Sequence, residues 1–437
     1  MIASGKNKCM TKYQSSTLRN NEFLNPIEKI NRIICIALCA FVSWPYLSSK
    51  LGLLIFIVLF GAWLLTTDYR CFLDNLTLDI LMISCWLFTF SPYIITGNFF
   101  YGAYTPRAAI LIFVLFVCGT LINHYYMFYK KDVQMLGKIA LFSLLFYTIA
   151  SLQTYLGLKR FPLASRMLAV GDEAIKQNYQ GLGIGGFGFV YSSVFIIIPL
   201  LYFLFKKNSV LTVWHRMISI IAFISMFIML FHASYTIALL FTLIGIFLVF
   251  FIRGKKSLIL GIIFAVFLLI FFPRELIGSF LVNIADLFQT NETIRVKFLD
   301  FAQGFLSEST GSQTSYRFQL YLSSFKTFLS NPLFGIYGPF GNPMTAVIGG
   351  HSGWLDLMAY YGLFGSLPLF IGISLVLRRQ LLFFTEHPYF NYLLIVQILF
   401  IVFGFINPTI TIYEIGFSIF VIAPTLPFLP FAFQKNN

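Results

Sequence analysis

The sequence contains few charged residues, and fewer of them are acidic than basic. Only 11% of its 437 residues are charged, against 58% hydrophobic residues, with 16 Asp and Glu beside 30 Lys and Arg. A soluble protein of this length needs roughly twice that charged fraction to cover its surface. The composition therefore excludes an ordinary soluble protein and indicates a chain that buries most of its surface in lipid.

Cysteine and recognisable cofactor motifs are also scarce. None of the 6 cysteines lies in residues 157–184 or 273–350, the two longest polar segments after the N-terminus, so we expect no disulfide there. No cluster of Cys and His has metal-ligand spacing, and no glycine-rich phosphate loop is present, so we expect no metal and no cofactor. Residues 1–30 are basic and lack the apolar core and cleavage site of a signal peptide, which predicts a cytoplasmic tail.

Long apolar runs dominate the rest of the chain. A helix needs about 20 apolar residues to cross ~30 Å of hydrocarbon, and lipid forces such runs to be helical. The sequence therefore predicts an all-α polytopic membrane protein with about 12 transmembrane helices, in which residues 31–437 form one membrane domain. The expected spans are residues 31–48, 50–66, 76–95, 107–123, 135–156, 185–205, 216–233, 236–252, 258–272, 353–377, 391–407 and 413–432.

The net charge of +14 raises the question of nucleic acid, but the positions of the basic residues favour a membrane topology. Basic residues recur at alternate span ends, the pattern in which positive charge stays on the cytoplasmic side. Both termini are then cytoplasmic, which agrees with an even number of spans, and we expect no nucleic acid partner. The residues are Lys29, Arg32, Lys130, Lys131, Lys206, Lys207, Arg253, Lys255, Lys256, Arg378 and Arg379.

The first polar segment, residues 157–184, is expected on the outer face although it is basic. Arg160 and Arg166 are either solvated charges or part of a site that recognises an anionic group through arginine's forked donors. The glycine-rich residues 181–188 follow, where backbone N–H groups could approach a phosphate at the start of a span.

The second polar segment, residues 273–350, predicts a large outer loop with amphipathic helices. Residues 274–306 alternate apolar and polar positions in a way that suits the membrane surface. A second helix is expected to be capped by Thr314 or Ser315 and to end at Asn331-Pro332, because proline cannot continue the hydrogen-bond ladder.

Arg317 and His351 are the strongest candidates in that loop. Arg317 lies at the edge of the apolar stripe of the second helix, so it either holds a ligand or pairs with Asp356 or Glu308. His351 follows a glycine pair and opens the tenth span, where it is either a packed polar residue or a proton acceptor near neutral pH. Asp356 lies about one and a half turns further in, where a carboxylate is costly unless it is paired.

Four motifs together resemble one known family. Arg317, the run Asn331-Pro332-Leu333-Phe334-Gly335, His351-Ser352 and the run Tyr361-Gly362-Leu363-Phe364-Gly365 are similar to the superfamily of O-antigen ligases and O-antigen or capsule polymerases, which assemble bacterial envelope glycans. The resemblance extends to the dozen spans and two outer loops. Arg160, followed by a glycine after ten residues, also resembles the arginine–glycine motif of the polymerases.

The resemblance implies an enzyme that transfers a glycan from undecaprenyl pyrophosphate to an acceptor hydroxyl, without metal or nucleotide. His351 would be the base and Arg317 would stabilise the pyrophosphate, so both are catalytic candidates. The substrate-binding candidates are Arg160, Arg166, Tyr316 and Asp356.

We interpret the chain as a polymerase of oligosaccharide repeat units in the bacterial cytoplasmic membrane. A ligase that moves finished glycan to lipid A core or another acceptor is the nearest alternative. A lipid-linked oligosaccharide flippase also has about twelve spans, but its short loops do not fit the large loop here. A secondary transporter would show paired broken helices in two halves. The expected partners are the lipid-linked oligosaccharide and membrane lipid, with a flippase and a chain-length regulator as further partners.

Overall fold

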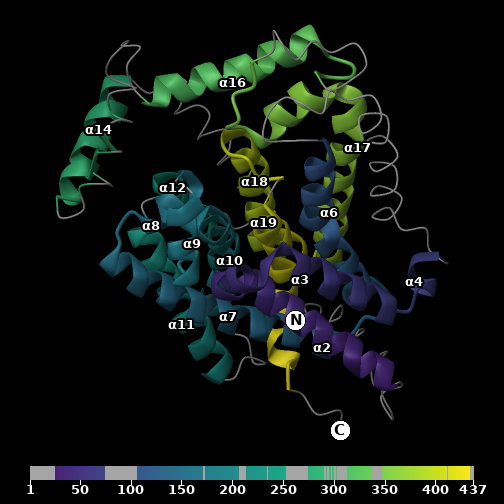
Figure 1. The fold of residues 1–437 in the computed structure, drawn as a ribbon. Helices are drawn as coiled ribbons and strands as arrows, with labels where there is room; N and C mark the ends of the chain where they lie inside the picture. Colours follow the sequence, from purple (N-terminus) through teal and green to yellow (C-terminus); the bar gives the residue numbers. More distant parts are fainter. Residues whose placement is uncertain are drawn as a thin grey trace.

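The protein is helical throughout the part of the chain that the structure describes. This computed structural model describes residues 25–73, 106–170, 173–205, 213–233, 235–251, 274–289, 313–336, 347–410 and 412–433, with single positions between 292 and 302. These residues form helices and no strand, which confirms the all-α prediction (Figure 1).

The helices follow one another along both halves of the chain. The N-terminal half contains α2 (Pro26–Ser43), α3 (Pro45–Thr66), α4 (Arg70–Leu73), α6 (Pro106–Asn123), the π-helix η1 (His124–Tyr129), α7 (Val133–Arg160), α8 (Ala164–Val170), α9 (Glu173–Gly181) and α10 (Phe187–Phe205). The C-terminal half contains α11 (Val213–His232), α12 (Thr236–Phe251), α14 (Arg274–Leu287), α16 (Gln313–Ser330), α17 (Gly353–Phe383), α18 (Phe390–Ile406), α19 (Tyr413–Phe417), η2 (Ser418–Ile422), α20 (Ala423–Thr425) and η3 (Leu426–Phe431).

Several of these helices have the length and composition of membrane spans, as expected of a membrane protein. Within the described residues, 5 helical segments qualify, and four shorter apolar helices accompany them. The expected spans at 76–95 and 258–272 lie outside the described residues, so a total of twelve stays a prediction. The five segments are Val133–Arg160, Phe187–Phe205, Val213–His232, Gly353–Phe383 and Tyr413–Phe431.

The boundary between the first two expected spans was wrong. The sequence prediction carried the first span through residue 48, but α2 ends at Ser43 and α3 begins at Pro45. Proline fits the first position of a helix because its missing N–H has no partner there in any case. Pro45 therefore starts the second helix instead of lying inside the first.

One expectation for the outer segments also needs correction. Residues 157–184 stay a predicted outer segment, within which α7 continues to Arg160 and α8 and α9 follow. Thr314 and Ser315 were expected as helix caps, but α16 already begins at Gln313. Several polar residues in succession can each cap a helix, and the sequence does not tell which one does. The predicted end is confirmed, because α16 stops at Ser330 before Asn331.

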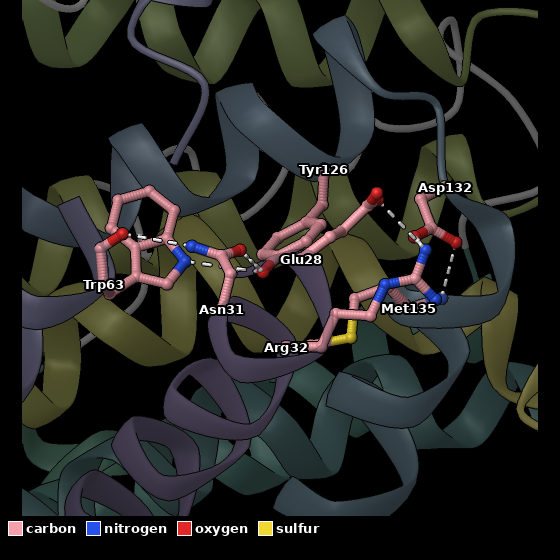
Figure 2. A network of polar contacts seen from close by, with 7 residues as sticks. All are labelled: Glu28, Asn31, Arg32, Trp63, Tyr126, Asp132 and Met135. Atoms are coloured by element: carbon pink, nitrogen blue, oxygen red, sulfur yellow. Dashed lines mark hydrogen bonds and ion pairs between the residues drawn. The ribbon is translucent and has the colours of Figure 1, made fainter. Parts of the chain in front are cut away.

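One end of the bundle is held by buried polar contacts between its N-terminal helices (Figure 2). Arg32 on α2 pairs with Asp132, the cap of α7, at 2.7 Å. The Asn31 side chain accepts from the Tyr126 hydroxyl and donates to the Trp63 carbonyl at 3.0 Å. Because these groups are buried, each needs its partner, so the contacts fix the mutual positions of α2, α3 and α7.

The other end of the bundle carries α14 and α16, at the top of Figure 1, while the C-terminus lies at the bottom. The Tyr321 hydroxyl on α16 donates to the carbonyl of Ile406, where α18 ends, at 2.8 Å. The Tyr235 hydroxyl, just before α12, donates to the carbonyl of Ser165 on α8 at 2.7 Å. We call this the α16 end of the bundle, and it holds the candidate site.

Candidate functional site

The centre of the site is a buried carboxylate between α16 and α17. Asp356 accepts a hydrogen bond from the Ser324 hydroxyl and another, at 3.0 Å, from the backbone N–H of Ser352. The Ser324 oxygen in turn accepts from the N–H of Gly349 at 2.8 Å. A buried carboxylate is tolerated only with such donors, so Asp356 ties the glycine turn, α16 and α17 together.

The start of α17 is fixed in the same place. Ser352 caps the helix, since its hydroxyl oxygen accepts from the N–H of Leu355 at 3.2 Å. The next N–H, of Gly353, donates to the carbonyl of Asn407 at 3.0 Å. His351 thus lies one residue before the cap, at the helix N-terminus as the sequence suggested, on a turn attached to both α17 and the end of α18.

The two glycine-containing motifs of the sequence dock against each other. The run that begins at Asn331 follows α16 and lies against a kink of α17 at Gly362, whose φ is +61°. The N–H of Leu363 donates to the carbonyl of Pro332 at 2.8 Å, which is possible only because the kink interrupts the helix ladder. A methyl group on Gly362 would lie 2.4 Å from the backbone of Leu333, so no side chain fits.

Arg317 and His351 act on each other electrostatically. Both side chains are partly buried. The pKa of His351 is lowered from its usual 6.5, first because burial disfavours the imidazolium and second because the Arg317 guanidinium is nearby. The pKa of the Tyr321 phenol is raised, mainly by burial, while Arg317 acts to lower it. Both effects favour the neutral imidazole of His351 at neutral pH.

The charge of Arg317 has no carboxylate partner within the described residues. Asp356, one of the two partners considered from the sequence, is bonded to Ser324 and Ser352 instead. Glu308, the other, lies outside the described residues. Arg317 therefore keeps its donors for a group that the described part of the chain does not supply.

Sequence reasoning missed an aromatic cluster around Tyr191. Arg317 also acts electrostatically on the phenol of Tyr191, on α10. The Tyr191 ring lies 4.5 Å from that of Phe403 and 5.6 Å from that of Tyr235, between ring centroids. Aromatic residues are 19% of this chain, so nothing in the sequence distinguishes these from the rings that only pack.

The remaining sequence candidates are not joined to this site by any contact described. Arg160 is the last residue of α7, and its side chain is exposed. Arg166 lies on α8 and Tyr316 on α16, but the described residues do not include their side chains. All three stay predictions. Among the described residues, no group of three His, Cys, Asp or Glu side chains could hold a metal ion.

A comparison with protein families agrees with the resemblance seen in the motifs. Residues 220–370 match the family model described as O-antigen ligase, a range that includes α16, Arg317, His351 and the start of α17. The match confirms the resemblance to the O-antigen ligase and polymerase superfamily. No curated protein matches the chain significantly. The match supports a membrane enzyme of the glycosyltransferase type that acts on lipid-linked oligosaccharides, and it does not separate ligase from polymerase.

Proposed function

We propose that this protein is a polymerase that joins lipid-linked oligosaccharide repeat units at the outer face of the bacterial cytoplasmic membrane. The observation that carries the proposal is the pair formed by Arg317 and His351. An arginine without a carboxylate partner in the described chain lies beside a histidine whose pKa is lowered. A transfer from a pyrophosphate to a hydroxyl needs those two groups, a cation for the leaving group and a neutral base for the acceptor.

The reaction follows from their roles. His351 takes the proton of the acceptor hydroxyl as its oxygen attacks the anomeric carbon of the donor sugar. The bond from that carbon to the pyrophosphate oxygen breaks, and the electron pair leaves with undecaprenyl pyrophosphate. Arg317 stabilises the charge that develops on the pyrophosphate, for which its two parallel donors are well shaped. Asp356 touches neither substrate in this scheme and acts as a positioning residue for the turn that carries His351.

The exposed face of α16 suits the lipid part of the donor. Its apolar side chains at Phe318, Leu322, Phe325 and Leu329 point away from the bundle and are exposed. Tyr321 and Ser324, further round the helix, bond to the bundle. A helix with an exposed apolar face lies stably along a membrane surface, where polyprenyl chains are found. This supports a donor that approaches from the membrane with its pyrophosphate at Arg317.

A ligase is the second candidate, favoured by the description of the matching family as O-antigen ligase. The same donor and the same two residues would serve, and the acceptor would be lipid A core or another finished carrier. The distinction depends on the acceptor, which the contacts around Arg317 and His351 do not specify.

The surface polysaccharide of a strain lacking the gene separates these functions. Loss of a polymerase leaves core carrying a single repeat unit on a gel. Loss of a ligase leaves polymer on undecaprenyl pyrophosphate and core without polymer. Lipid-linked units that accumulate inside the cell would contradict both and favour a flippase. Complementation with wild-type protein, but not with Arg317→Ala at equal abundance, ties the result to this site.

A further inference from the structure

A polar pocket opens beside the start of α10. Its volume is about 360 Å³, and it lies where the start of α10 meets α19 and the start of α3. The residues that line it include Ser48, Leu168, Gln180, Phe187, Tyr413 and Glu414.

Among the described residues that line this pocket, Glu414 is the one acidic side chain. Its carboxylate accepts hydrogen bonds from its own backbone N–H and from the Tyr413 hydroxyl. A methyl group on Gly188 would lie 2.8 Å from a Glu414 carboxylate oxygen, so the carboxylate lies against the first turn of α10. The expectation that the glycine-rich residues 181–188 could receive a phosphate stays a prediction.

The pocket is close to the candidate catalytic pair along two routes. One is a short segment, since the carbonyl of Asn407 accepts from the N–H of Gly353, two residues after His351, and Glu414 follows seven residues later. Seven residues span at most ~25 Å. The other is aromatic, since the Phe187 ring in the pocket wall lies 4.4 Å from that of Tyr191, on which Arg317 acts. A glycan of a few sugars could reach from the pair to the pocket.

The described lining suits a polyhydroxylated ligand. Glu414 can accept hydrogen bonds, and both Gln180 and Ser48 can donate and accept them. Phe187 and Leu168 supply apolar wall against which the carbon face of a ring can pack. These properties together match a sugar ring.

We infer that the pocket around Glu414 is a saccharide-binding subsite that holds a sugar of the acceptor or of the donor glycan, away from the bond being made. The role of this subsite in the reaction rests on the proposed function, because the subsite would add specificity to that same transfer. Binding of a saccharide to the pocket does not depend on the proposed function and can be tested on its own.

The binding test uses the purified full-length protein in detergent and one defined probe. The probe is the oligosaccharide repeat unit released by mild acid from the polysaccharide of the source strain, measured by calorimetry or by saturation-transfer NMR. Glu414→Gln and Gln180→Ala should each weaken binding about 10-fold, because a charge-assisted or neutral hydrogen bond to a hydroxyl is lost. Gln180 is exposed, so its variant should fold normally. The matched control is Glu386→Gln, because Glu386 is an exposed glutamate that follows α17 and is not among the lining residues of the pocket. This variant should leave binding unchanged.

The kinetic test assigns the sugar. In a transfer assay with separately varied substrates, Glu414→Gln should raise KM about 10-fold for one substrate while kcat at saturation stays within about twofold. A raised KM for the acceptor places the acceptor sugar in the pocket, and a raised KM for the donor places the donor sugar there. If the wild-type protein binds no probe, or if both variants bind as wild type does, the subsite is excluded. If the wild-type protein binds the probe but transfers nothing, the proposed function fails and the subsite stands.

Discussion

The Ser324 hydroxyl donates a hydrogen bond to the Asp356 carboxylate across 32 positions of sequence. Ser324 is on α16, two turns after Arg317, and Asp356 is in the first turn of α17, just after His351. The bond therefore links the element that carries the candidate cation to the element that carries the candidate base. Both partners are buried, so neither can exchange the other for water.

Removal of this bond should disturb both stability and transfer. Ser324→Ala leaves a buried carboxylate with one donor fewer, which costs about 1–3 kcal/mol of unfolding free energy. We expect kcat to fall because the turn before α17 loosens, and the effect should be smaller in an Asp356→Ala background if the two act as a pair. Thermal unfolding in detergent and the transfer rate measure the two effects. Ser323→Ala is the control, since that hydroxyl bonds only within α16, to Gln319. Additive losses in the double variant would contradict a direct coupling.

Replacement of Arg317 should reveal whether its fork or only its charge matters. Arg317→Lys should fail nearly as badly as Arg317→Ala, because lysine keeps the charge but loses the paired donors. The loss of a contact made in the transition state typically costs ~3 kcal/mol, a factor of about 10² in rate. Lys326→Ala on the same helix, an exposed residue, should leave the rate unchanged. Full activity of the lysine variant at normal abundance would indicate a solvated charge instead.

The pH dependence of transfer should follow His351. Its folded-state pKa lies below 6.5, so the base is neutral at pH 7, and activity should disappear only as pH falls through that lower value. Arg317→Gln removes a nearby positive charge and should move the acid limb of the residual activity to higher pH. His351→Ala should abolish transfer at normal protein levels. A His351→Gln variant with normal rate and an unchanged acid limb would show that His351 only positions substrate.

The kink of α17 should reject any side chain at Gly362. Gly362→Ala combines a strained φ of +61° with a contact of 2.4 Å to the backbone of Leu333, so we expect a loss of about 3 kcal/mol or more in unfolding free energy. Gly350→Ala is the matched control, because its φ is +70° but nothing lies within 4 Å of the added methyl. It should cost only the strain, about 1–2 kcal/mol. Equal losses, measured by thermal unfolding, would mean that the docking of the two motifs contributes nothing.

Labelling at the two ends of the bundle should reveal the topology. Lys326 on α16 and Glu386 after α17 are both exposed, and α17 separates the ends where they lie. In a background without the 6 native cysteines, Lys326→Cys should react with a membrane-impermeant maleimide in intact spheroplasts and Glu386→Cys should not. The positive-inside pattern is the reason. The reverse pattern would overturn the predicted orientation, and labelling of both would contradict a spanning α17.

The helices were predictable and their boundaries less so. Apolar runs of the needed length led to α10 and α18 within a few residues, because lipid leaves such runs only one conformation. The misplacement of Pro45 and of the cap of α16 arose where several local choices were compatible with the same sequence. The short helices α8 and α9 within residues 157–184 were not predicted, because they carry too little periodicity to be recognised.

The sequence predicted only those residues of the candidate site whose type or position is unusual in this chain. Arg317 and His351 stand out because Arg317 lies at the edge of an apolar stripe and His351 follows a glycine pair at the start of an expected span. Tyr191 and Glu414 do not stand out. Tyr191 is one aromatic residue in an apolar span, and Glu414 becomes notable only when the fold places it against Gly188 and a pocket.

The sequence by itself determined that the chain is a helical membrane protein, because hydrophobicity and backbone hydrogen bonding act on each segment locally. It also supplied the motifs that link residues 220–370 to the O-antigen ligase family. Only the tertiary structure decided that Asp356 bonds to Ser324 and not to Arg317, and that Gly362 receives the loop after α16. Those outcomes depend on which buried donors and surfaces meet across distant helices, and that is a property of packing that no single segment contains.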